Sequence, residues 1–243
     1  MENVAIVLAA GSGKRMNSDI KKQYMELCGK PLLYYSLKVM EDSDVISDVI
    51  LVVGDGEKEK VLTDIVKKYN FKKVHDIVIG GKERYHSVMN ALDAISAHGG
   101  CKYVMIHDGA RPLITGEIVA QIYGDTCVTK ACVTAVRSKD TIKIADELGF
   151  AESTPNRSMV WNVQTPQSFE FSLIRSAYAT LKEEEARPVQ KGITVTDDAM
   201  VVETFTNNKV KLVEGSYENI KITTPDDMVY AEAILKRRLE KEG

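Results

Sequence analysis

Apolar and polar residues follow two different periods along the chain, and the two periods take turns. Short apolar runs rich in β-branched residues predict buried strands. The predicted strands are residues 4–10, 48–53, 73–79 and 102–107. Between them, apolar residues recur at intervals of three or four, as at Leu33, Leu37 and Met40, which predicts amphipathic helices. Strands that alternate with helices predict a mostly parallel sheet with right-handed crossovers and helices on both faces.

The expected fold is an α/β, Rossmann-like three-layer sandwich in a single domain, residues 1–243. A chain of 243 residues, 44% hydrophobic and 28% charged, can bury one substantial core. Thr196 is expected to cap a further helix with its hydroxyl, and late strands are expected at residues 209–213 and 219–223. Ligands of such sheets bind at the carboxyl ends of the strands, so polar residues there are candidates for a site.

Residues 137–165 interrupt the alternation. Short strand-like pieces lie on both sides of the turn at Glu147-Leu148-Gly149, which predicts a protruding β-hairpin arm. A hairpin that stands off a sheet is marginally stable by itself, so we expect it to pack on a partner surface. The most economical partner is the same arm in a homodimer, and the alternative is an arm folded back on its own domain.

Charge and cysteine content narrow the class of protein. The net charge is −3, so no basic face for nucleic acid is expected. The four cysteines form no C-x-x-C pair, which indicates reduced thiols of a cytoplasmic protein. No apolar stretch approaches the roughly 20 residues of a membrane span, and no targeting segment is expected. The partners are therefore expected to be small molecules.

The first predicted strand ends in a small-residue turn that is followed by basic residues. Such a turn lets backbone N–H groups approach a polyanion, which nearby cations can neutralise. The turn and the cations are Gly11, Ser12, Gly13, Lys14, Arg15, Lys21 and Lys22. It is not a Walker A loop, because Leu8 stands at the first glycine position and Arg15 replaces the Ser/Thr. It is not a dinucleotide fingerprint either, because Met16 stands at the third glycine position.

An acidic residue follows the fourth predicted strand. Asp108, in the run HDGARP, is expected at the mouth of the ligand crevice, where a carboxylate can hold magnesium beside phosphates. The alternative is a helix cap or a salt bridge to Arg111. The run GGKERYHSV after the third strand has paired glycines that permit close approach to a planar ring, with Arg84 and Ser87 as donors.

The stretch LAAGSGKRM, then KKQY and GKP, resembles the signature of sugar-phosphate and polyol-phosphate nucleotidyltransferases. Further matches are GGKERYHSV, HDGARP, DTIK, TPNR, QTPQSF, TDDA and NIKIT. Together they most closely resemble the 2-C-methyl-D-erythritol 4-phosphate cytidylyltransferase family of the non-mevalonate isoprenoid pathway. Two departures are Lys21, where the family has proline, and Gly109, where it usually has alanine. Ribitol-5-phosphate cytidylyltransferase, a nucleotide-binding regulatory module without turnover, and a dehydrogenase are the competing interpretations.

The resemblance implies transfer of a cytidylyl group from CTP to the acceptor phosphate with Mg²⁺ or another divalent cation. The catalytic residues that it implies are Arg15, Lys22, Lys221 and Arg157. The nucleotide-binding residues would be Leu8, Ala9, Ala10, Gly11, Gly13, Gly80, Gly81, Arg84, Ser87, Asp108 and Gly109. The acceptor would contact Asp108, Arg111, Thr141, Arg157, Thr165, Thr196 and Lys221, and Asp108 would hold the metal. Arg157 and Thr165 would come from the neighbouring subunit's arm.

Overall fold

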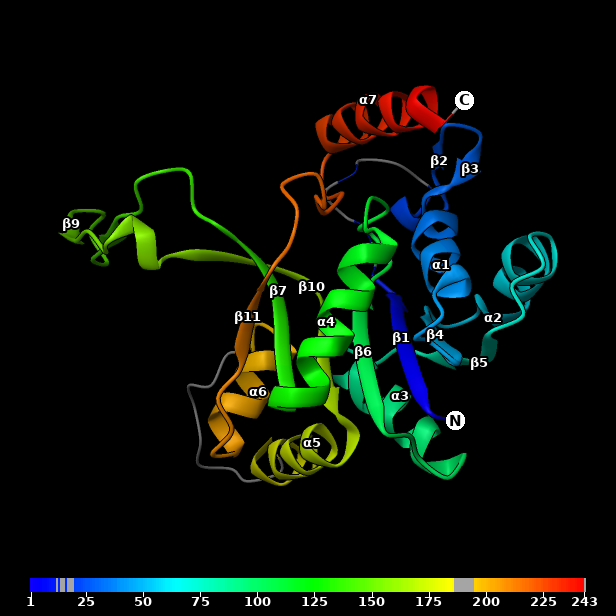
Figure 1. Cartoon of the computed structure of the whole chain (residues 1–243), viewed down its shortest axis with the longest axis horizontal. Helices are drawn as coiled ribbons and strands as arrows, with labels where there is room; N and C mark the ends of the chain where they lie inside the picture. Colours follow the sequence, from blue (N-terminus) through cyan, green and yellow to red (C-terminus); the bar gives the residue numbers. More distant parts are fainter. Residues whose placement is uncertain (12, 14–15, 17–19, 186–194, 243) are drawn as a thin grey trace.

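A mostly parallel sheet runs through the centre of the chain (Figure 1). The computed structural model describes residues 1–11, 13, 16, 20–185 and 195–242. Within this part of the chain the sheet has seven strands. In spatial order they are β11 (Lys211–Glu214), β7 (Ala131–Arg137), β10 (Trp161–Glu170), β6 (Tyr103–Asp108), β1 (Asn3–Ala9), β4 (Asp48–Val53) and β5 (Val74–Ile79). Strand β10 runs antiparallel to both β6 and β7, and the other pairs of neighbours are parallel.

Helices cover both faces of this sheet, as the alternation along the chain predicted. The helices are α1 (Leu32–Asp42), α2 (Lys58–Val61) with the π-helical turns η3 (Leu62–Lys67), α3 (Arg84–Ala97), α4 (Gly116–Thr129), α5 (Phe171–Glu185), α6 (Asp198–Phe205) and α7 (Pro225–Glu242). In β1, Ala5 and Val7 belong to the core under α1 and α4, whereas Val4 and Ile6 belong to the core under α3, α5 and α6. Because side chains on a strand alternate between faces, one buried strand supplies both cores.

The C-terminal helix α7 builds a smaller third core above the carboxyl end of the sheet (Figure 1). Ala231 and Leu235 of α7 pack with Leu27 and Leu32, next to the short strands β2 (Glu26–Leu27) and β3 (Lys30–Pro31). Asp227 fixes the start of the helix, because it accepts hydrogen bonds from the backbone N–H groups of residues 223 and 224. Ala110 of this core also lines the candidate cleft described below.

A two-stranded hairpin connects β7 to β10 and extends away from the sheet in Figure 1. Its strands are β8 (Ile144–Ala145) and β9 (Ala151–Ser153), followed by the 3₁₀ turn η4 (Arg157–Met159). The expected boundary at residue 165 is wrong, because residues 161–163 already pair with β7. The turn at Asp146 is closed by its own carboxylate, which accepts from the N–H groups of residues 148 and 150.

Two local expectations about secondary structure are wrong. Residues 219–223 form no strand, because their backbone bonds to separate loops and side chains: the N–H of Ile222 donates to Ala110, and its carbonyl accepts from Lys22. Helix α6 is capped by Asp197, whose carboxylate accepts from the N–H of Met200 at 2.8 Å. The hydroxyl of Thr196 therefore does not serve as the cap.

Candidate active site

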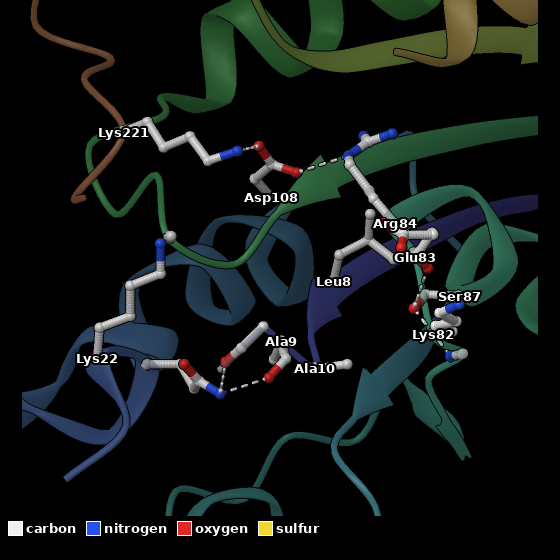
Figure 2. A pocket seen from close by; sticks show the side chains of 14 residues that line it. Leu8, Ala9, Ala10, Lys22, Lys82, Glu83, Arg84, Ser87, Asp108 and Lys221 are labelled. Atoms are coloured by element: carbon white, nitrogen blue, oxygen red, sulfur yellow. Dashed lines mark hydrogen bonds and ion pairs between the residues drawn. The ribbon is translucent and has the colours of Figure 1, made fainter. Parts of the chain in front are cut away.

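A cleft of about 400 Å³ opens at the carboxyl ends of β1 and β6 (Figure 2). Its lining residues are Leu8, Ala9, Ala10, Gly11, Lys22, Gln23, Gly81, Lys82, Glu83, Arg84, Ser87, Asp108, Ala110 and Lys221. They come from the end of β1, the segment before β2, the start of α3, the end of β6 and the loop before α7. Ten of the fourteen are candidates from the sequence. The parallel strands bring them together because their carboxyl ends meet at one edge of the sheet.

Asp108 lies between two cations at the centre of this cleft (Figure 2). Its Oδ2 is 2.8 Å from the ammonium of Lys221, and its Oδ1 accepts a hydrogen bond of 3.3 Å from Nε of Arg84. Burial opposes ionisation here, but Arg84 and Lys221 hold the pKa of Asp108 well below its usual range. The carboxylate is therefore charged at neutral pH.

Arg84 makes a second, bidentate contact away from the cleft. Its two terminal nitrogens donate to the two carboxylate oxygens of Asp198 at 2.9 and 2.8 Å. Burial works against its charge, yet Asp198 and Asp108 raise the pKa of Arg84 above its ordinary value. The guanidinium therefore bridges a buried carboxylate to the one that faces the cleft.

Thr165 and His107 support the backbone behind Asp108. The N–H of Asp108 donates to the hydroxyl oxygen of Thr165 at 3.0 Å, and that hydroxyl lies 3.1 Å from Nδ1 of His107. Nε2 of His107 lies 3.2 Å from the carbonyl of Arg111, which can only accept, so the proton is on Nε2 and Nδ1 accepts from Thr165. Burial lowers the pKa of His107 to about 4, which keeps the ring neutral.

Lys22 and Gln23, from the segment before β2, also line the cleft. The ammonium of Lys22 donates to the carbonyl of Ile222 at 2.9 Å, so the segment before α7 and the segment before β2 are joined across the cleft. The buried amide of Gln23 donates to the carbonyls of Ala9 and Gly11 at 2.6 and 3.1 Å. These bonds tie the backbone at the start of the glycine turn to the segment before β2.

The paired glycines after β5 allow the start of α3 to approach β1. A Cβ on Gly80 would lie 2.4 Å from that of Ala10, and a Cβ on Gly81 would lie 2.3 Å from that of His86. The hydroxyl of Ser87 accepts from the N–H of Gly81 at 3.0 Å. Glycine is required at both positions by close contact, and Ser87 orders the loop that it follows.

These features agree with a comparison with known protein families. The family model described as 2-C-methyl-D-erythritol 4-phosphate cytidylyltransferase matches residues 3–237. The chain belongs to this family. Because the match covers both the glycine turn and the segment before α7, it includes all the elements that line the cleft.

Curated cytidylyltransferases and solved structures agree along the whole chain. The 2-C-methyl-D-erythritol 4-phosphate cytidylyltransferase of Lachnoclostridium phytofermentans is 49% identical over 237 residues, with 97% of each chain covered. That of Alkaliphilus oremlandii is 46% identical over 244 residues, with 99% of each covered. The 4-diphosphocytidyl-2C-methyl-D-erythritol synthase of Anaerococcus prevotii superposes with a TM-score of 0.82 at 35% identity, covering 97% of this chain and 96% of the other.

Two departures from the cytidylyltransferase pattern have local structural partners. The ammonium of Lys21 pairs with Glu57 at 2.8 Å, and Glu57 also accepts from the hydroxyl of Tyr24 and the N–H of Gly54. The pair anchors the segment that carries the next lysine. At Gly109, a Cβ would lie only 3.0 Å from the carbonyl oxygen of residue 8, so packing here is adapted to glycine.

Several predicted site residues lie apart from the cleft. Thr141 and Arg157 are exposed on the hairpin, where the guanidinium of Arg157 donates to the carbonyl of Lys139 at 3.3 Å. Thr196 is exposed before α6. Thr165 instead lies in its own chain's sheet, 4% exposed and bonded to Asp108, so the expectation that a neighbouring arm presents it is wrong.

Other predicted residues adjoin the cleft without lining it, or fall outside the described part of the chain. Gly13, Gly80, Gly109 and Arg111 belong to the first group, and Arg111 donates to the carbonyl of Asn219 at 2.7 Å. Arg15 lies outside the residues that the structure describes.

Four lining residues and one buried carboxylate are not among the residues predicted from the sequence. The four are Gln23, Lys82, Glu83 and Ala110. All four stand inside the quoted motifs, so their neighbours were the available signal. Asp198 stands inside TDDA, but its contact with Arg84 crosses 114 positions of sequence and left no local signal.

The donor set at the cleft fits a cation shared with a substrate. Among the described residues, no group of three or more His, Cys, Asp or Glu side chains is arranged to hold a metal ion. Magnesium is commonly held by one or two carboxylates together with substrate phosphates and water. Asp108, charged and facing the cleft, is suited to be one such ligand.

Proposed function

We propose that this chain transfers the cytidylyl group of CTP to 2-C-methyl-D-erythritol 4-phosphate, with release of pyrophosphate, in isoprenoid precursor synthesis. The observation that carries the proposal is family membership over residues 3–237, together with a cleft that gathers Lys22, Arg84 and Lys221 around Asp108. The curated relatives are 2-C-methyl-D-erythritol 4-phosphate cytidylyltransferases, and the coverage is nearly complete in both directions.

The chemistry requires two polyanions to meet in one cleft. The acceptor phosphate attacks the α-phosphorus of CTP in line, and the bond to pyrophosphate breaks. The residues bring the partners together and stabilise charge on the α-phosphoryl oxygens, for which Lys22 is placed at the cleft and Arg15 is proposed by resemblance. No nucleophilic side chain is needed, and the neutral His107 is bonded on both of its ring nitrogens.

Magnesium or another divalent cation is proposed to enter with the CTP phosphates. It would be held by Asp108 and would neutralise charge on the phosphates. Lys221, now 2.8 Å from that carboxylate, would be left to face the acceptor. Arg84 and the glycine loop at residues 80–81 are proposed to bind the nucleotide.

The arm is proposed to complete the acceptor site of a second subunit in a homodimer. Arg157 and Thr141 are exposed on the hairpin, and its tip carries Leu148 and Phe150 at 83% and 70% exposure. Apolar side chains at a hairpin tip favour a partner surface.

We place the reaction in the cytoplasm. Cys28, Cys101, Cys127 and Cys132 are free thiols, which fits a reducing compartment. None of the helices in the described part of the chain combines the length and apolar character that a membrane crossing needs.

An acceptor panel tests the proposal. The protein is incubated with CTP, Mg²⁺ and either methylerythritol phosphate or ribitol 5-phosphate, and pyrophosphate is measured. We expect release with the first acceptor only, and we expect UTP, ATP and GTP to be poor substitutes for CTP. Equal or faster release with ribitol 5-phosphate would favour the alternative acceptor, and no release with either would favour a regulatory module.

A further inference from the structure

The buried carboxylate of Asp198 lies behind the cleft and has no role in the proposal above. Asp198 is 0% exposed and is absent from the cleft lining. Its Oδ1 accepts from Arg84 at 2.9 Å and from the hydroxyl of Tyr178 at 2.6 Å, and its Oδ2 accepts from Arg84 at 2.8 Å. Of its two side-chain partners, only Arg84 lines the cleft, so Arg84 connects Asp198 to a ligand bound there.

The start of α6 holds Asp198 in place independently of Arg84. Asp197 caps the helix, and the amide of Gln167 donates to the second oxygen of Asp197 at 3.0 Å. The carbonyl oxygen of the same amide accepts from the N–H of Ala199 at 2.9 Å. The QTPQ and TDDA motifs thus meet at the start of α6. Their hydrogen bonds fix the backbone that carries the Asp198 carboxylate.

Asp198 determines how Arg84 meets Asp108. An arginine binds a carboxylate most strongly when its two parallel N–H groups grip both oxygens. Asp198 accepts one N–H from each terminal nitrogen of Arg84, whereas Asp108 receives a single hydrogen bond, of 3.3 Å, from Nε. Asp198 also balances the charge of Arg84. Lys221 is the second cation in contact with Asp108.

We infer that Asp198 is a positioning residue that occupies the fork of Arg84 and thereby keeps the Asp108 carboxylate available to a divalent cation bound with CTP. The inference rests on the proposed function, in which Asp108 is the cation ligand. Without the charge at position 198, Arg84 turns its fork toward Asp108. Arg84 and Lys221 then neutralise that carboxylate together.

The test measures how much Mg²⁺ strengthens CTP binding to the intact protein. Calorimetric titration with CTP, in the presence and absence of Mg²⁺, gives this gain as a ratio of dissociation constants. We expect the Asp198→Asn variant to reduce this ratio on the order of tenfold. In that variant the positive charge of Arg84, which contacts Asp108, is no longer balanced by Asp198. Asp108→Asn should lose the gain as well.

The matched control is Tyr178→Phe, which removes one hydrogen bond from Asp198 and leaves its charge. A merely structural role for the cluster would lower the gain in both variants, whereas the inference expects Tyr178→Phe to keep it. The double variant Arg84→Gln/Asp198→Asn removes the fork together with its counter-charge. We expect it to recover the gain lost in Asp198→Asn, even if CTP binds more weakly overall.

The outcomes separate the inference from the proposed function. If Asp108→Asn loses the gain and Asp198→Asn keeps it, the inference is overturned and the metal role of Asp108 stands. If Asp108→Asn keeps the gain, the inference and the metal role of Asp108 are both overturned, whereas cytidylyl transfer itself is still decided by the acceptor panel. Should Asp198→Asn fail to fold, the double variant, whose buried cluster is neutral, decides: a retained gain supports the inference, and a lost gain refutes it.

Discussion

His107 should make the stability of the protein depend on pH between about 4 and 6.5. Its ring is 0% exposed, and burial lowers its pKa from 6.5 to about 4. Between these values the unfolded chain carries one proton more at this position than the folded chain does. The free energy of unfolding therefore falls as the pH falls through this window, and above pH 6.5 this histidine contributes no slope.

The size of the effect follows from the pKa difference. A pKa difference of about 2.5 units corresponds to about 3 kcal/mol, which is lost at roughly 1.4 kcal/mol per pH unit. The buried His107 also supports Asp108, because the hydroxyl of Thr165 bonds both to His107 and to the N–H of Asp108. Protonation on Nδ1 would remove the acceptor that Thr165 uses.

Urea unfolding of the protein and of His107→Gln, at several values between about pH 7 and 5, measures this slope. The glutamine amide can still donate to the carbonyl of Arg111, but it cannot titrate. We expect the variant to be less stable at neutral pH and the difference from the parent to shrink as the pH falls. His75→Gln, at a side chain that is 43% exposed, is the control for replacing a histidine outside the core. An unchanged slope in His107→Gln would refute the reasoning.

Three further predictions concern the segment before β2 and the arm. Lys22→Ala should lower kcat on the order of 100-fold with a smaller effect on CTP binding, because its charge is needed most where transition-state charge develops; an effect on KM only would assign it to ground-state binding. Lys21→Pro should keep activity and lower the free energy of unfolding by about 1 kcal/mol, because residue 21 already has φ −59° but the partly buried pair with Glu57 is lost; a large loss of activity would show that the lysine itself acts in the site. Mixing inactive Arg157→Ala and Lys22→Ala proteins should give heterodimers with one intact site and up to about half the normal activity, by symmetry; no recovery after demonstrated subunit exchange would place Arg157 in its own subunit's site.

The sequence predicted the parallel core because each buried strand has a local signature. The run at residues 48–53 became β4 with those bounds, and the helical spacing of Leu33, Leu37 and Met40 became the buried face of α1. The prediction for residues 219–223 was wrong for a different reason. Alternating Ile220 and Ile222 resemble a strand, but Ile222 is buried under α7 instead of in the sheet.

The candidate site was predictable where a motif follows the end of a strand. Topology then carries such residues to one edge, as it carries Leu8 and Asp108. The prediction for Thr165 was wrong because pairing between β10 and β7 keeps the residues before it in the sheet rather than in the arm. The register of β10 against β7 shifts between Val163 and Gln167. No local pattern in the sequence shows where such a shift occurs, or whether the residues beside it lie in the sheet or in the arm.

By itself the sequence determined the order of strands and helices, the small-residue turns at the cleft, and the residue types available for binding phosphate. These depend on local periodicity and on backbone conformations that neighbouring residues impose. The tertiary structure decided which charges meet: Lys221 with Asp108, Lys22 with the carbonyl of Ile222, and Arg84 with Asp198. Contacts of that kind join residues separated by about a hundred positions or more, and their geometry follows from the packing of whole elements, which no local pattern encodes.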